Sequence, residues 1–126
     1  MAAADPEVSD DGEPVYEVRC DADGKNCKVD MDTFVGWRMY TSNCLACHGQ
    51  DGKGSTIAPN LMDRLNAHVD YPRFTDVVTN GFTGTMGVMP SFKNSQNVID
   101  RIPSIYKYLR ARADGALAGG RPERLP

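Results

Sequence analysis

The sequence predicts one small all-α domain. Apolar residues recur at helical spacing in three stretches, at about residues 33–43, 71–80 and 101–114. Strand-like runs reach only two or three residues and lie near the N-terminus. The 126 residues suffice for one domain, but 12 glycines and 8 prolines make the chain rich in loops and modest in apolar content. We therefore expect a bound apolar group to complete the core.

Charge and hydropathy argue against two broad classes of protein. The formal net charge is −3 and the sequence has no basic cluster, which argues against nucleic-acid binding. No apolar run approaches the ~20 residues that a membrane-spanning helix needs. We expect no nucleic-acid partner and no membrane span.

The expected domain lies between two polar ends. Residues 1–14 hold five acidic residues and no basic ones, so we expect a disordered leader there. This leader lacks the apolar centre of a signal peptide, so no intact signal peptide is present. We expect the mature N-terminus of an exported chain whose signal peptide has been removed, with a natural start as the alternative. Residues 15–115 should form the folded domain, and residues 116–126 a C-terminal tail.

The first helix is expected from about Thr33 to Asn43, with Asp32 as its N-cap. A glycine inside a helix costs about 1 kcal/mol relative to alanine. Gly36 therefore indicates either the close approach of another backbone or a neutral surface position. The inner face, at positions i, i+3, i+4 and i+7, consists of Thr33, Gly36, Trp37 and Tyr40.

The second helix is expected between Tyr71-Pro72 and Asn80-Gly81, because proline is accepted in a first turn and glycine ends a helix. Residues 82–92 are interrupted by glycines and have too few periodic positions for another helix, so we expect a loop. The apolar face of the second helix consists of Phe74, Val77 and Val78.

The last helix is expected from about Arg101 to Asp114, with Asp100 as its N-cap and Gly115 as its stop. We expect its apolar stripe to pack against the Gly36 face of the first helix. This stripe consists of Ile102, Ile105, Tyr106 and Leu109.

Residues 44–48 read Cys-Leu-Ala-Cys-His, and we expect the rest of the chain to be arranged around them. Two thiols three positions apart can reach two vinyl groups of a porphyrin, and the next side chain can then turn to the iron. Cys44 and Cys47 should thus bind one haem c covalently, with His48 as axial ligand. The alternatives are a thioredoxin-like redox pair, which lacks its βαβ context, and a zinc site, for which the remaining cysteines and histidine have no usual spacing.

Met89 is the expected second axial ligand. Thioether sulfur is a usual partner of histidine on an electron-transfer haem, and Pro90 restricts the backbone beside this methionine. Met86 is the alternative in the same loop. His68 lies in a polar stretch and should be an exposed, titrating imidazole.

Pro59 is the candidate for a supporting role behind the histidine. Its carbonyl could accept a hydrogen bond from Nδ1–H of His48 and so orient the imidazole ring. An ordinary loop proline before a short helix at Leu61–Leu65 fits the same spacing.

Cys20 and Cys27 are the only pair left if Cys44 and Cys47 carry thioethers, which predicts a disulfide between them. The residues between them include Asp23-Gly24, which favours a tight turn, and the short runs on either side could pair as a β-hairpin. The alternative is two free thiols. A disulfide needs an oxidising compartment, which agrees with an exported chain.

These features resemble the class I cytochrome c fold, whose N- and C-terminal helices cross around one covalently bound haem. The resemblance covers residues 32–114 and rests on the Cys-x-x-Cys-His motif, the Pro-Asn-Leu at 59–61, Met89-Pro90 and a Tyr-x-Tyr-Leu in the last helix. In that family a glycine and an aromatic residue before the first haem cysteine contact the last helix. Gly36 and Tyr40 match these positions, and their expected partners are Ile105, Tyr108 and Leu109.

A narrower resemblance suggests a donor. Residues 29–38, 59–61, 89–92 and 105–115 are similar to periplasmic cytochromes that accept electrons from PQQ-dependent alcohol dehydrogenases, including the acceptor of lanthanide-dependent methanol dehydrogenase. This implies a periplasmic carrier with such a dehydrogenase as donor and a cytochrome or terminal oxidase as acceptor.

The ligand set predicts electron transfer and no enzyme activity. With both axial positions filled, one-electron exchange is what remains for the iron. We expect a soluble, monomeric, single-haem carrier. The alternatives are an electron-transfer domain or subunit of a larger dehydrogenase, and a haem enzyme with a labile sixth ligand.

Overall fold

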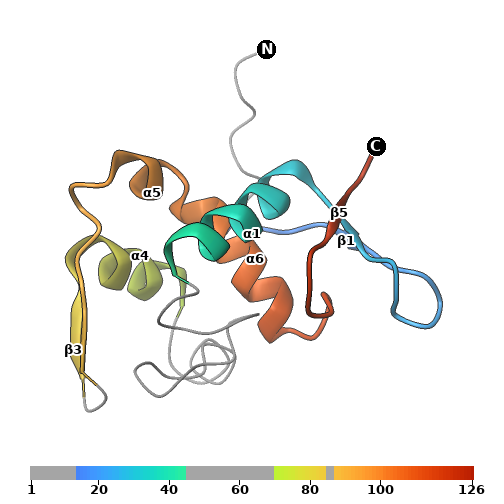
Figure 1. Cartoon of the computed structure of the whole chain (residues 1–126). Coiled ribbons are helices and arrows are strands. Elements are labelled where there is room, and N and C mark those ends of the chain that lie inside the picture. The colour runs from blue at the N-terminus through green and yellow to red at the C-terminus, as the bar shows by residue number, and fades with distance from the viewer. Residues whose placement is uncertain (1–13, 45–69, 85–86) are drawn as a thin grey trace.

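The computed structural model describes residues 14–44, 70–84 and 87–126. Two helices, α1 (Met31–Asn43) and α6 (Ile102–Ala113), cross at its centre (Figure 1). Helix α4 (Tyr71–Asn80) and the short helix α5 (Gln96–Asp100) lie on one side of this pair, and a small sheet lies on the other. The predictions for the leader, Cys47, His48, Pro59, residues 61–65, His68 and Met86 lie outside the described residues.

Helix α1 begins two residues earlier than the sequence predicted. Its N-cap is Asp30, whose carboxylate accepts hydrogen bonds from the backbone N–H of Thr33 at 3.2 Å and from the Thr33 hydroxyl at 2.5 Å. The prediction of Asp32 as N-cap was therefore wrong. Asp32 lies in the first turn, where its carboxylate is 3.4 Å from Nζ of Lys107.

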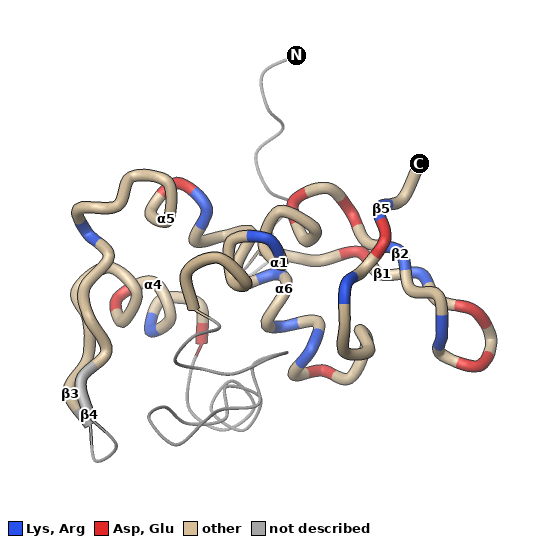
Figure 2. The backbone as a smooth tube through the Cα atoms, viewed as in Figure 1, with Lys and Arg blue, Asp and Glu red and all other residues tan. Residues whose placement is uncertain are grey.

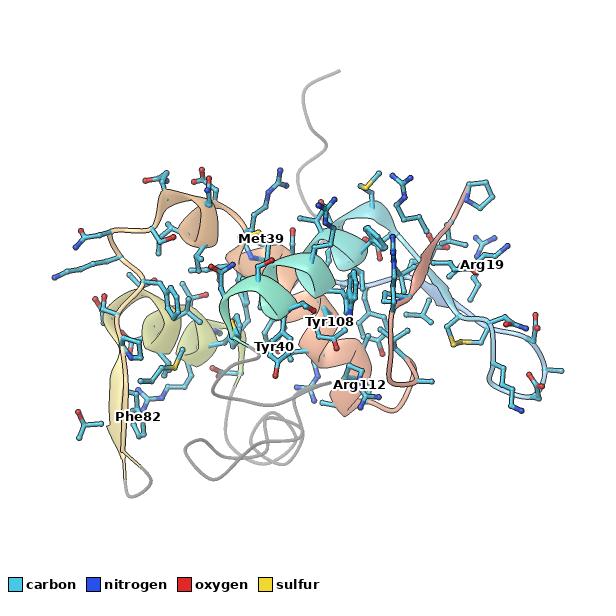
Figure 3. The ribbon with its side chains drawn as sticks, viewed as in Figure 1. Arg19, Met39, Tyr40, Phe82, Tyr108 and Arg112 are labelled. Atoms are coloured by element: carbon cyan, nitrogen blue, oxygen red, sulfur yellow. A yellow bond between two sulfur atoms is a disulfide. The ribbon has the colours of Figure 1, made fainter. Side chains whose placement is uncertain are left out.

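Gly36 lies where α1 crosses α6, as predicted. A Cβ atom at this position would overlap the backbone carbonyl of Ser104. The rings of Tyr40 and Tyr108 pack beside this crossing with centroids 5.6 Å apart (Figure 3). The predicted stripe of α6 is confirmed, because all of its members are buried: Ile102, Ile105, Tyr106 and Leu109.

The start of α6 differs from the prediction. Asp100 is the last residue of α5, and its side chain accepts a hydrogen bond from Nε2 of Gln96 at 2.6 Å. Asp100 is thus no N-cap for α6, and that prediction was wrong. Arg101 occupies the N-cap position, and its side chain makes no hydrogen bond to the helix. The proline in the first turn of α6 has no backbone N–H, so it leaves one donor fewer that a cap would have to satisfy.

Helix α4 has the predicted bounds. Asp70 caps it through a hydrogen bond from the Arg73 backbone N–H at 3.0 Å. Phe74 and Val78 are buried, and the rings of Tyr71 and Phe74 pack on Tyr106 with centroids 5.0 and 5.4 Å away. These aromatic contacts fix α4 to the central helix α6.

Two small sheets accompany the helices. Strand β1 (Val18–Arg19) pairs antiparallel with β2 (Lys28–Val29), as predicted for an N-terminal hairpin, and β5 (Glu123–Arg124) pairs with β2 in parallel. Strands β3 (Phe82–Gly84) and β4 (Gly87–Met89) form an antiparallel hairpin where the sequence predicted a loop. The fold therefore contains more than the all-α class predicts, because strands of two or three residues show no periodicity in the sequence.

The C-terminal residues also contact the domain. Leu117 is 2% exposed, and β5 binds the edge of β2 through hydrogen bonds from the backbone N–H groups of Glu123 and Leu125. The predicted tail at residues 116–126 thus includes a buried leucine and a strand.

Acidic and basic residues are both distributed over the described part of the chain (Figure 2). Every helix within residues 14–44, 70–84 and 87–126 is too short or too polar to cross a bilayer.

Candidate haem site

Cys44, the first cysteine of the predicted haem motif, lies at the C-cap of α1. Its backbone N–H donates to the carbonyl of Tyr40 at 2.8 Å, which continues the helical bonding to this residue. Its side chain is half-buried and packs against the core. Because Tyr40 is fully buried against α6, Cys44 is held at the end of a firmly packed helix.

Met89, the predicted axial methionine, is the last residue of β4 and pairs with Phe82 of β3. Its side chain is partly buried against the same core cluster that Cys44 contacts. The Phe82 side chain is 46% exposed, at the outer edge of the molecule (Figure 3). Met89 is therefore partly buried against the core, although its partner in the hairpin is largely exposed.

The core that Cys44 and Met89 both contact is apolar. Buried Phe74, Val78 and Tyr106 belong to this core, and half-buried Tyr71 and Phe92 pack against it. Burial raises the pKa of the Tyr71 phenol, and the nearby Thr75 hydroxyl opposes this shift. The phenol therefore stays neutral at physiological pH.

This arrangement fits a c-type haem. A half-buried thiol at a helix end and a thioether on a second element, both packed against one apolar core rich in aromatic rings, suit a covalently attached porphyrin. The other predicted contributors, Cys47, His48 and Pro59, lie in the part of the chain that the structure leaves undescribed.

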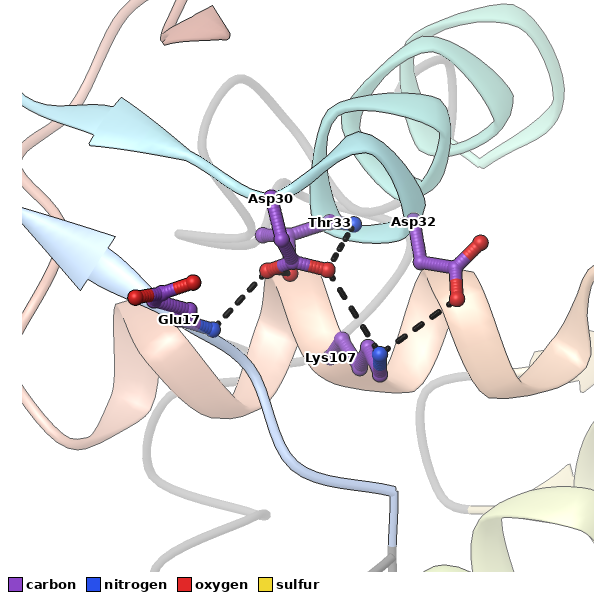
Figure 4. A network of polar contacts seen from close by, with 5 residues as sticks. All are labelled: Glu17, Asp30, Asp32, Thr33 and Lys107. Atoms are coloured by element: carbon purple, nitrogen blue, oxygen red, sulfur yellow. Dashed lines mark hydrogen bonds and ion pairs between the residues drawn. The ribbon is translucent and has the colours of Figure 1, made fainter. Parts of the chain in front are cut away.

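Lys107 is a buried charge that the sequence analysis did not single out (Figure 4). Its side chain is 3% exposed, and Nζ lies 3.5 Å from Oδ2 of Asp30 and 3.4 Å from Oδ2 of Asp32. Asp30 also accepts a hydrogen bond from the backbone N–H of Glu17 at 2.8 Å. One network therefore joins α6 to the start of α1 and to the segment before β1.

The pKa of Asp30 reflects this network. Burial acts to raise it, but hydrogen bonds from Thr33 and from the Glu17 backbone, together with the Lys107 charge, outweigh burial and hold the pKa below the usual carboxyl value. Asp30 therefore remains ionised at neutral pH.

Cys20 and Cys27 form the predicted disulfide, seven positions apart in the sequence. It closes the loop between β1 and β2. This sheet lies across the α1–α6 pair from α4 in Figure 1. The disulfide therefore links the two strands of a sheet that lies on the far side of the central helices from α4.

Comparison with known proteins identifies the family. A family model described as cytochrome c oxidase, cbb3-type, subunit III, matches residues 33–109. A crystal structure of the c-type cytochrome XoxG from Methylobacterium extorquens AM1 is similar with a TM-score of 0.83 and 38% identity, over 98% of this chain and 77% of that one. The chain belongs to the class I c-type cytochromes. The predicted class I cytochrome c fold agrees with this family, with the small sheets as an addition.

Two curated relatives of the cytochrome agree with this assignment. Cytochrome c-553I from Paracoccus denitrificans is 41% identical over 100 residues, which are 76% of this chain and 44% of the relative. Cytochrome c-555 from Methylococcus capsulatus is 33% identical over 97 residues, which are 76% of this chain and 75% of the relative. The chain thus spans less than half of the first relative and three quarters of the second.

The family determines the cofactor and the type of activity. The cofactor of the cytochrome is covalently bound haem c. The relatives of this chain are cytochromes c, which are electron-transfer proteins rather than enzymes.

Proposed function

We propose that the cytochrome holds one haem c through thioethers from Cys44 and Cys47, with His48 and Met89 as axial ligands. The placement of Cys44 and Met89 against one apolar core supports this ligand set. In the same proposal the carbonyl of Pro59 accepts a hydrogen bond from Nδ1–H of His48 and orients the ring. The bound haem supplies one-electron exchange between ferric and ferrous iron.

The residues around the site suit that exchange. Apolar side chains from α4 and α6 exclude water, and a low-dielectric surrounding disfavours the more highly charged oxidised centre. The thioether of Met89 is uncharged and acts in the same direction. Both effects raise the reduction potential, which suits a carrier that accepts electrons readily.

We further propose that the cytochrome works in the periplasm as a monomer and receives electrons from a PQQ-dependent alcohol or methanol dehydrogenase. It would pass them singly to a downstream cytochrome or terminal oxidase. The observation that carries this proposal is the similarity to XoxG, at 38% identity over 98% of the chain. The sequence resemblance to acceptors of quinoprotein dehydrogenases points to the same donor.

Rapid mixing tests the donor. The purified, haem-loaded cytochrome is oxidised and mixed with a substrate-reduced PQQ-dependent methanol dehydrogenase, and haem reduction is followed optically. We expect reduction much faster than that of an unrelated class I cytochrome of similar potential. Equal rates for the two cytochromes would overturn the proposed donor.

A further inference from the structure

The backbone on both sides of Met89 is held in place by neighbouring elements. Before Met89, strand β4 pairs with β3 in a register that sets Phe82 opposite Met89. After Met89, residues 90–92 run back along the end of α4. The backbone at Met89 is therefore held by the hairpin on its N-terminal side and by the end of α4 on its C-terminal side.

The contacts after Met89 use the last carbonyls of α4. Such carbonyls have no partner within their own helix and need one elsewhere. The hydroxyl of Ser91 donates to the carbonyl of Thr79 at 2.5 Å, and the backbone N–H of Phe92 donates to the carbonyl of Val78 at 3.0 Å. The Ser91 oxygen also accepts from the Lys93 backbone N–H at 3.2 Å. The chain after Met89 is thus bound to the C-terminal turn of α4.

Gly81 permits this close approach. It caps α4 with a φ of 82°, and a Cβ atom here would lie 2.7 Å from the carbonyl oxygen of Met89. The same Cβ would lie 2.9 Å from the backbone nitrogen of Ser91. Any other residue would push the Met89–Ser91 backbone away from the helix, since backbone atoms cannot yield as a flexible side chain can.

From this geometry we infer that Gly81 and Ser91 are positioning residues for the axial methionine. By tying the Met89–Ser91 backbone to α4, they determine how often the Met89 sulfur leaves the iron. Aromatic contacts from Tyr71 and Phe74 to Tyr106 connect α4 in turn to the central helix. The inference rests on the proposed function, in which Met89 is a ligand.

Cyanide binding to the oxidised holoprotein measures this directly. Cyanide can occupy the sixth position only while the thioether is away, so its binding rate scales with the fraction of open protein. In Ser91→Ala, which loses the hydrogen bonds to the Thr79 carbonyl and from the Lys93 backbone N–H, we expect binding about five-fold faster. Ser91→Thr retains a hydroxyl and should restore a rate near that of the wild type.

Ser95→Ala is the matched control for the serine. Ser95 lies at the N-cap of α5, and its side chain makes no capping hydrogen bond there. We expect its cyanide rate to stay within about two-fold of the wild type, as for a substitution away from any special contact.

Gly81→Ala should have the larger effect, with cyanide binding at least about ten-fold faster, because it displaces backbone atoms. Gly115→Ala is its control, since Gly115 has a φ of 78° and a Cβ atom added there would meet no other atom within 4 Å. Both substitutions thus carry the energetic penalty of an alanine at positive φ. Only the Cβ atom added in Gly81→Ala would collide with the Met89–Ser91 backbone.

Three further readouts separate positioning from global stability and from the ligand assignment. Haem content and thermal midpoint report whether a variant is folded, and the thioether–iron charge-transfer band of the oxidised spectrum reports the ligand. A wild type without this band overturns the ligand assignment itself. A wild type with the band, together with cyanide rates in Ser91→Ala and Gly81→Ala that match their controls, overturns the positioning role alone.

Discussion

The α1–α6 crossing and the α4–β4 corner are built from different interactions. At the crossing, two helices touch through the backbone at Gly36, and the surrounding side chains are almost fully buried. At the corner, the Met89 segment is held by hydrogen bonds to the last carbonyls of α4, and Ser91 is exposed. The first region is stabilised by packing, and the second depends on a few polar contacts.

This difference indicates where the molecule can open. Segments with few buried apolar contacts and exposed hydrogen bonds open at lower free energy than a packed core. Cys44, at the end of α1, thus belongs to the rigid region, and Met89 to the region that opens more easily. In the proposed ligand set, the covalent attachment at Cys44 thus lies on the rigid element and the axial Met89 on the looser one.

The largest effect is expected at the crossing itself. Gly36→Ala inserts a methyl group into the backbone of Ser104, so one helix must move. We expect the free energy of unfolding to fall by about 3 kcal/mol or more. Chemical denaturation of the holoprotein measures it, with Gly24→Ala, in open space at a positive φ, as control. A loss equal to that of the control would show that the crossing is not tight.

The disulfide gives the next effect and should leave the corner untouched. Replacing Cys20 and Cys27 together by serine removes a short cross-link, and the chain-entropy relation predicts a loss of about 2.5 kcal/mol. Thermal unfolding measures the loss. The thioether–iron band should be unchanged, since this sheet lies across the central helices from α4. Disappearance of the band would contradict the separation of the two regions.

The Lys107 network should contribute somewhat less. Lys107→Met keeps the apolar stem but leaves the carboxylates of Asp30 and Asp32 near each other without the ammonium group. We expect a loss of about 2 kcal/mol by denaturation, below the full cost of breaking a buried pair because both carboxylates reach solvent. Lys25→Met, in an exposed loop, is the control and should change stability little. Equal stability of both variants would exclude a role for the network.

The smallest effect is a pH dependence at the start of α1. The pKa of Asp30 is lower in the folded protein than in the unfolded chain, so its contribution is present above the unfolded value of about 3.9 and is lost as pH falls through the folded value. In Asp30→Asn, which can still cap the helix, thermal stability should fall less steeply in acid. Midpoints measured across the acid range test this. Identical slopes for both proteins would contradict it.

The parts that the sequence predicted are those with a local signature. Gly36 lies within a helical stripe and indicates a close backbone approach, and the family resemblance supplied the partner positions in α6. The bounds of α4 could be predicted because proline opens it and glycine ends it. The choice of Met89 over Met86 as axial ligand rests on its neighbour Pro90 and stays a prediction.

The parts that the sequence did not predict depend on distant contacts. The N-cap of α1 is one of two aspartates two positions apart, and both contact Lys107, which lies at least 75 residues later in the chain. Strand β5 pairs with β2, although the two strands come from opposite ends of the domain's sequence. The approach of Gly81 to Met89 likewise has no sequence pattern, because the hairpin between them was predicted to be a loop.

The central claim is that Met89, at the corner beside α4, is the second axial ligand. The most direct measurement is the oxidised absorption spectrum of Met89→Ala and Met86→Ala, each matured with haem c. We expect the thioether–iron charge-transfer band in the wild type and in Met86→Ala and its loss in Met89→Ala. A band that persists in Met89→Ala, or disappears in Met86→Ala instead, would contradict this account.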